Sequence, residues 1–189
     1  MNDKDQLVRR IIEEKGEKAV PILIDLLFEG DPEIADIAIE ALEALDCCKQ
    51  LFERLDLEMK KDEKNVGIYY IADLIGDKKC KDGIDYLKKM LNLIENENEA
   101  LIIHGALLKL GFKDSEKYLL YEFENDPYME EFLFDTALAL SQSDDEDVLK
   151  AISSKAKDHP ELIEILQSMC ERNPAFFSLL PEDLREKVR

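Results

Sequence analysis

The chain contains no tryptophan and little glycine or proline, with 7 and 6 of these residues among 189. Turns between short strands depend on glycine and proline, so their scarcity argues against a protein built from many strands. It favours long helices with short connections. The hydrophobic content of 46% is typical of a folding chain and excludes a disordered one.

Basic residues are in the minority, with 25 lysines and arginines against 44 acidic residues, which gives a formal net charge of −19. Such a charge repels phosphate groups, so we expect no binding to nucleic acid or to an anionic membrane surface. A simpler explanation of the same charge is that it keeps an elongated protein with a large surface soluble. No apolar run approaches the roughly 20 residues that span a bilayer, and the opening residues MNDKDQLVRR predict no signal peptide.

The four cysteines show no spacing typical of a disulfide framework, and the sequence contains no CxxC motif. Cys47 and Cys48 are adjacent, and adjacent cysteines seldom reach the geometry of a disulfide with each other. Cys80 and Cys170 stand alone in the sequence. We therefore expect buried, reduced thiols and a cytoplasmic protein, with redox chemistry as the minor alternative.

Residues 17–46, EKAVPILIDLLFEGDPEIADIAIEALEALD, predict two antiparallel helices joined by a turn at Gly30, Asp31 and Pro32. Asp31 is a good N-cap, and Gly30 is suited to end the preceding helix. In the second helix the polar residues recur every three or four positions and form one narrow stripe. A helix that is apolar over most of its circumference must be covered on two sides, so further hairpins must stack on this one.

The rest of the chain predicts further helices of the same kind. We expect Leu7, Ile11 and Ile12 of the first helix to point inward, and Leu101 and Leu108 to lie on the outer face of theirs. The expected helices are 3–14, 18–28, 31–45, 49–59, 64–75, 81–94, 97–110, 114–124, 126–140, 146–156 and 160–170, with two short helices that begin at Pro174 and Pro181.

The order K-A-V-P-x-L-x-x-L-L, then D-P-E-I and A-I-E-A-L-x-x-L, resembles a HEAT or HEAT-like (PBS lyase-type) repeat over residues 17–46. Ala35 departs from the arginine that HEAT repeats often carry there. The resemblance implies an all-α, right-handed α-solenoid of about five to six antiparallel helix pairs, with the second helices on the concave face. It implies one HEAT-like domain over 1–189, with an N-terminal cap pair at 1–30, central repeats at 31–157 and a C-terminal cap at 158–189.

No group of residues points to catalysis, a cofactor or a metal. Neither His104 nor His159 has a second histidine four residues away, and a half-buried helix histidine explains His104 better than a zinc ligand does. The acidic run from Asp144 to Asp147 lacks the glycine turn and the ligand spacing of an EF-hand loop. A solvated helix N-terminus explains this run.

Lysine recurs on the second helix of each expected pair, on the face that we expect to be outward and concave. Between Lys60 and Lys89 eight lysines stand against six acidic residues, so this segment is locally positive. A basic groove could hold an acidic peptide, and exposed tyrosine often anchors an interface, although an ordinary solvated surface is the simpler explanation of the lysines. The candidate partner-binding residues are Lys49, Lys88, Lys89, Lys117, Tyr118, Tyr121 and Lys150.

The resemblance implies a scaffold, an adaptor or an assembly factor, and we predict a non-catalytic protein–protein interaction module. Its expected partner is another protein or an acidic peptide on the concave face. One alternative is an enzyme on the same scaffold, such as a bilin lyase or a DNA glycosylase. The other is a structural subunit of a homo-oligomer, or a homodimer, if Leu101 and Leu108 expose an apolar patch.

Overall fold

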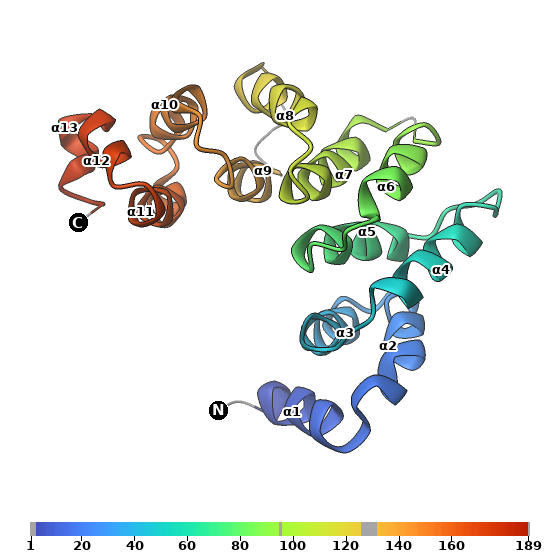
Figure 1. The fold of residues 1–189 in the computed structure, drawn as a ribbon. Helices are drawn as coiled ribbons and strands as arrows, with labels where there is room; N and C mark the ends of the chain where they lie inside the picture. Colours follow the sequence, from blue (N-terminus) through green and yellow to red (C-terminus); the bar gives the residue numbers. More distant parts are fainter. Residues whose placement is uncertain (1–2, 95, 126–131, 189) are drawn as a thin grey trace. The chain divides into compact units, whose positions relative to one another are not determined.

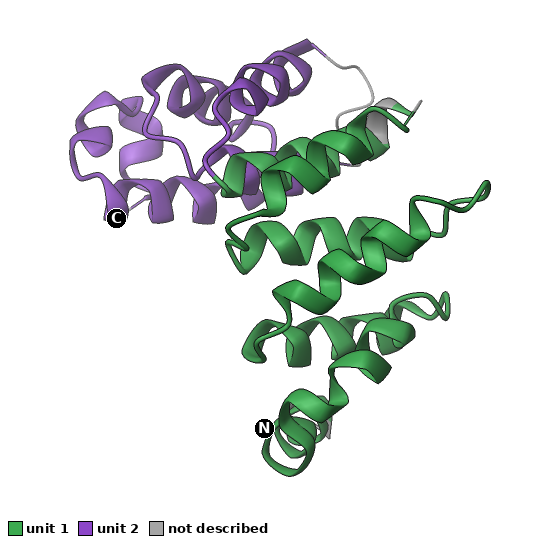
Figure 2. Cartoon of the chain, turned by 45° about the vertical axis from the view of Figure 1, so that its right-hand side comes forward, with its two compact units in different colours: residues 1–110 green, residues 111–189 purple. Residues whose placement is uncertain are grey.

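The computed structural model describes residues 3–94, 96–125 and 132–188, and the regular elements in these ranges are all helical (Figure 1). This confirms the all-α prediction. The chain divides into two compact units, residues 1–110 and residues 111–189 (Figure 2).

Unit 1 consists of two rows of helices. Helices α1, α3, α5 and α7 pack in series and form the first row, and helices α2, α4 and α6 pack in series and form the second row. Each row therefore takes every other helix, as expected of stacked hairpins. The elements are α1 (Asp3–Lys15), η1 (Gly16–Ala19), α2 (Val20–Leu26), α3 (Pro32–Ala44), α4 (Cys48–Glu58), α5 (Gly67–Asp77), α6 (Gly83–Leu91) and α7 (Glu97–Lys109).

The first turn between rows follows the local rules that the sequence predicts. Gly30 has a φ of +78°, which is the left-handed region that glycine adopts without a steric cost. The Asp31 side chain accepts hydrogen bonds from the N–H groups of Glu33 at 3.0 Å and Ile34 at 3.3 Å. It therefore satisfies two of the unpaired donors at the start of α3.

Small residues let the helices of the first row approach closely. Ala35, Ala38 and Ala41 of α3 are buried. A Cβ added to Gly76, in the last turn of α5, would lie 2.8 Å from Cα of Ala106 in α7. Gly76 is therefore the point of close contact between α5 and α7.

The expectation that all cysteines are free thiols is wrong for two of them. Cys48 and Cys80 form a disulfide with a Cα–Cα distance of 5.7 Å, whereas Cys47 and Cys170 are free and buried. The two partners are 32 residues apart, which is about one helix pair. Because α4 packs on α6, the first residue of α4 comes next to the turn that precedes α6.

Three expectations about which residues face solvent are also corrected. Leu101 and Leu108 are buried, with 5% and 6% of their surface exposed, so the predicted outer apolar patch is wrong. The reason is that α7 packs against both α5 and α6 and is covered on two sides. Leu7, which was expected to point inward, is 45% exposed.

Unit 2 continues with helices that pack on their neighbours in sequence or on the next but one. Helix α8 packs against α9 and α10, and α11 packs against α10 and α12. Residues 126–131, where we expected the first half of a helix, lie outside the described residues. The elements are α8 (Asp114–Asn125), α9 (Leu133–Leu140), α10 (Glu146–Lys155), η3 (Pro160–Leu162), α11 (Ile163–Arg172), α12 (Ala175–Leu179) and α13 (Glu182–Arg185).

The close contact at Gly76 predicts the effect of a single methyl group. In an open helix, Gly→Ala stabilises by about 0.5–1 kcal/mol. Here we expect Gly76→Ala to lower the free energy of unfolding by roughly 1–3 kcal/mol, because the backbone of α7 must move away. Urea unfolding measures the change, with the exposed helix substitution Ser154→Ala as control. Stabilisation by Gly76→Ala would contradict this packing.

His104 in α7 predicts a loss of stability at low pH. Burial lowers the pKa of His104 to about 4 from 6.5. Between these values the unfolded chain takes up a proton that the folded chain does not, so stability falls as the pH drops from 6.5 to 4. The full shift corresponds to about 3 kcal/mol, and solvent screening of the half-buried ring lowers the expected loss to roughly 2 kcal/mol. We expect His104→Gln to flatten the unfolding free energy over this window, measured by urea unfolding at several pH values. Parallel curves for the two proteins would exclude this role.

Candidate functional site

The predicted partner-binding residues fall into two sets, one in each unit. In unit 1, Lys49 lies on α4, and Lys88 and Lys89 lie on α6. In unit 2, Lys117, Tyr118 and Tyr121 lie on α8, and Lys150 lies on α10. In both units the two helices that carry the set pack against each other. The structure therefore gives two candidate surfaces, one within each unit.

The surface of unit 1 is centred on an aromatic pair between α4 and α6. The rings of Phe52 and Tyr86 stack with their centroids 4.5 Å apart and their planes at 6°. Both residues are half-buried, so the stack joins the two helices and still contributes to the surface. Pairs of this kind contribute about 0.5–1.5 kcal/mol beyond the area that they bury.

Three lysines lie on the same two helices as this stack. The Nζ atom of Lys89 lies 5.2 Å from the Tyr86 ring centroid, close enough for a cation–π contact. The Lys49 side chain is 85% exposed and lies 3.7 Å from the Glu53 carboxylate. Lys88 is exposed as well. We call the residues Lys49, Phe52, Glu53, Tyr86, Lys88 and Lys89 the α4–α6 surface.

Sequence reasoning missed the centre of this surface. Neither Phe52 nor Tyr86 was among the candidate residues. The signal that could have found them is their spacing: Tyr86 follows Phe52 by 34 residues (86 − 52), about the length of one helix pair. Equivalent positions on adjacent second-row helices are side by side.

A tight turn fixes the start of α6 against α5. The N–H of Cys80 donates to the carbonyl of Ile75 at 3.1 Å, and the N–H of Gly83 donates to the carbonyl of Cys80 at 2.9 Å. A Cβ added to Gly83 would lie 2.5 Å from a methyl carbon of Ile75. The disulfide from Cys80 to Cys48 then ties the first residue of α4 to this turn.

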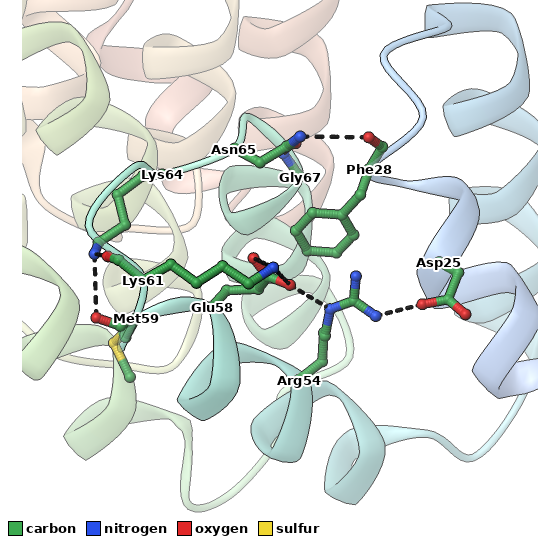
Figure 3. Close-up of polar contacts among 9 residues, drawn as sticks. All are labelled: Asp25, Phe28, Arg54, Glu58, Met59, Lys61, Lys64, Asn65 and Gly67. Atoms are coloured by element: carbon green, nitrogen blue, oxygen red, sulfur yellow. Dashed lines mark hydrogen bonds and ion pairs between the residues drawn. The ribbon is translucent and has the colours of Figure 1, made fainter.

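An ionic cluster fixes the other side of α4 against α2 (Figure 3). Arg54 donates from Nε to Glu58 at 2.8 Å and from Nη1 to Asp25 of α2, and its guanidinium lies 4.1 Å from the Phe28 ring centroid. The Lys61 ammonium lies 2.7 Å from the second Glu58 oxygen. Burial raises the pKa of Glu58, but the hydrogen bonds from Lys61 and Arg54 outweigh this and lower it. Glu58 is only 3% exposed and its charge is already paired, so the cluster positions α4.

The loop after α4 is held by side-chain bonds to backbone. Asn65 donates to the carbonyl of Phe28 at 3.3 Å and accepts from the N–H of Gly67 at 2.9 Å. Lys64 donates to the carbonyl of Met59 at 3.1 Å (Figure 3). These bonds connect the end of α2 with the start of α5, so α4 is fixed at its sides and at its end.

The surface of unit 2 is less defined by contacts than the α4–α6 surface. Tyr121 is 63% exposed, Lys117 is exposed and Tyr118 is half-buried. Lys150 pairs with Asp147 at 2.8 Å, one turn away on the same helix. The role of these residues in partner binding stays a prediction.

Other groups with possible chemistry have structural explanations. The Asp145 side chain caps α10 by accepting from the N–H of Asp147 at 2.8 Å, which accounts for part of the acidic run. In the described part of the chain, no group of three or more His, Cys, Asp or Glu is arranged to hold a metal ion. Nor does any helix within the described ranges have the length and apolar character that crossing a membrane requires.

In comparisons with known proteins, the chain matches no family model, no curated protein and no solved structure. The resemblance to HEAT-like repeats therefore stays a prediction, and any functional proposal depends on the residues themselves.

The ionic cluster predicts a large effect for one arginine. Arg54→Met leaves the buried Glu58 with Lys61 as its remaining cation, so we expect the free energy of unfolding to fall by roughly 2–3 kcal/mol. The matched control is Lys49→Met on the same helix, which removes the exposed pair with Glu53 and should change stability by about 0.5 kcal/mol or less. Equal effects of the two substitutions in urea unfolding would show that the cluster does not hold α4.

Proposed function

We propose that the chain is a right-handed, HEAT-like α-solenoid that acts as a protein–protein interaction module. The two rows of unit 1 support this, because each row takes alternate helices, as in stacked hairpins. The second row corresponds to the helices that line the concave face in the family that the sequence resembles.

We propose further that the α4–α6 surface binds an acidic segment of a partner protein. The observation that carries this proposal is the half-buried Phe52–Tyr86 stack, which lies on the same two helices as Lys49, Lys88 and Lys89. Half-buried aromatic rings offer an anchor for an apolar or aromatic side chain. The lysines attract the carboxylates that flank such an anchor.

The charge of the whole chain favours this choice of surface. With a net charge of −19, most of the protein repels an acidic segment. A locally basic patch is then the place where such a segment encounters the least repulsion, and complementary charge mainly increases the association rate and fixes orientation. Binding should therefore weaken as salt is added.

The two alternatives have less support. Association of identical chains through Leu101 and Leu108 is not proposed, because both side chains are buried in unit 1. An enzyme on the same scaffold stays an expectation from the resemblance, and no observation in the described residues favours it.

Two substitutions test the proposed surface by fluorescence anisotropy. The probe is a short fluorescein-labelled peptide rich in glutamate with a central phenylalanine. We expect Tyr86→Ala to raise its Kd roughly tenfold through loss of the anchor, and Lys89→Glu to raise it by a similar factor at low salt. Only the effect of Lys89→Glu should shrink as salt is added.

Matched controls separate the surface from the net charge. Lys18→Glu in η1 and Lys157→Glu in unit 2 make the same change of charge at exposed positions that belong to neither α4 nor α6. Both should leave the Kd within about twofold, since an exposed charge outside the contact surface is screened by salt. A lysine-rich probe is attracted by the net charge of −19, so Tyr86→Ala and Lys89→Glu should not weaken its binding. If Lys89→Glu and the two controls raise the Kd equally, net charge alone explains the interaction and no specific surface exists.

A further inference from the structure

The disulfide lies at one end of the α4–α6 surface. Cys48 is the first residue of α4 and lies one helical turn before Phe52, and Cys80 lies in the turn that leads into α6 and Tyr86. The bond therefore connects the two segments that carry the stacked rings. Any change in its redox state acts on the end of α4 that also carries Lys49.

The two sulfur atoms differ in their access to solvent. Cys48 is half-buried, whereas Cys80 is only 2% exposed. An external thiolate can therefore approach the Cys48 sulfur more easily than the Cys80 sulfur. The neighbouring thiol of Cys47 is buried and donates to the carbonyl of Leu42 at 3.5 Å, and burial raises its pKa, so it is a poor nucleophile for internal exchange.

The start of α4 has no other strong attachment of its own. Its N-cap residue, Cys47, makes no capping hydrogen bond through its side chain, so the first N–H groups of the helix lack the partner that Asp31 supplies to α3. The N-cap residue of α6, Asp82, also makes no side-chain cap, but the turn before α6 is hydrogen-bonded to α5 and packs on Ile75. Opening the disulfide should therefore loosen α4 far more than α6.

We propose that the Cys48–Cys80 disulfide is a redox switch of the α4–α6 surface: reduction by a dithiol frays the first turn of α4 and weakens binding of the acidic segment. The effect on binding rests on the function proposed above. The effect on α4 stands on the geometry alone.

The reaction is a two-electron thiol–disulfide exchange. A thiolate of the dithiol attacks the Cys48 sulfur, the bond to Cys80 breaks, and Cys80 leaves as a thiolate that takes a proton from water. The second thiol of the reductant, as its thiolate, then attacks the mixed disulfide and releases Cys48, which is protonated. The dithiol is oxidised to a cyclic disulfide, and the protein gains two electrons and two protons.

Binding and hydrogen exchange together test the switch. The glutamate-rich probe is titrated into oxidised protein and into protein reduced with dithiothreitol, and we expect reduction to raise its Kd roughly tenfold. Cys48→Ser/Cys80→Ser should bind weakly with or without the reductant. Cys170→Ser, which removes a buried free thiol in unit 2, should respond to the reductant as the wild type does. In hydrogen exchange, the amides from Leu51 to Arg54, which donate to the carbonyls at the start of α4, should exchange about tenfold faster after reduction, while those of α6 change little.

The two readouts distinguish the switch from the proposed function. If the probe binds equally to both redox states, the switch is overturned and the binding surface stands. If the probe binds neither state but exchange in α4 still rises on reduction, the proposed function fails and the structural switch stands. If exchange in α4 does not respond to dithiothreitol although mass spectrometry shows both thiols reduced, the disulfide does not control this helix.

Discussion

The structure depends on helices that are apolar over too much of their circumference to be covered by a single partner. The buried residues of α5, which include Ile68, Ile71, Leu74 and Ile75, cover more than one face of the helix, and α5 packs against α3, α4, α6 and α7. Burial of such a helix is favourable only when neighbours lie on several sides, so each hairpin requires the next one. This requirement arranges unit 1 as two rows.

The two rows are fastened by different interactions. The helices of the first row are joined by close packing of small residues and, at their ends, by contacts of charged side chains. Lys109 of α7 pairs with Asp73 at 2.6 Å and Asp77 at 2.7 Å on α5, and Lys78 donates to the carbonyl of Leu45 at 2.6 Å at the end of α3. The second row is joined by single specific contacts: an ionic cluster from α2 to α4, and an aromatic stack and a disulfide from α4 to α6.

The parts of this arrangement that depend on local chemistry could be predicted from the sequence. The cap at Asp31 and the turn at Gly30 follow from backbone rules that act within a few residues. The all-helical class follows from periodicity and from the scarcity of glycine and proline. The burial of Leu101 and Leu108 could not be predicted by analogy with α3, because the exposure of a residue on α7 depends on which helices cover α7.

Contacts between helix pairs were the least predictable, since they require the register of one helix on another. Cys48 and Cys80 look unrelated in sequence, and Tyr86 looks like an ordinary surface tyrosine, until α4 and α6 are placed side by side. Their spacing would have indicated both contacts, because 32 and 34 residues are each about the length of one helix pair. Where helix pairs of similar length follow one another, polar or reactive residues one pair apart should therefore be tested as contacts before they are interpreted as isolated positions.

The proposed surface on α4 and α6 differs in exposure from the central helices of the first row. Helices α5 and α7 use most of their circumference for burial, whereas α4 and α6 retain exposed lysines and half-buried rings beside their contacts. Helix α4 is also the element with the most specific fixation: Arg54 on one side, Phe52 on the other and Cys48 at its start. A helix held by separate contacts at its sides and at its end presents its free face in one orientation, and removal of one contact changes that face locally. Side chains that are ordered before binding lower the entropic cost of binding. Among the contacts that hold α4, the Cys48–Cys80 disulfide is the one that a reductant can open and an oxidant can close.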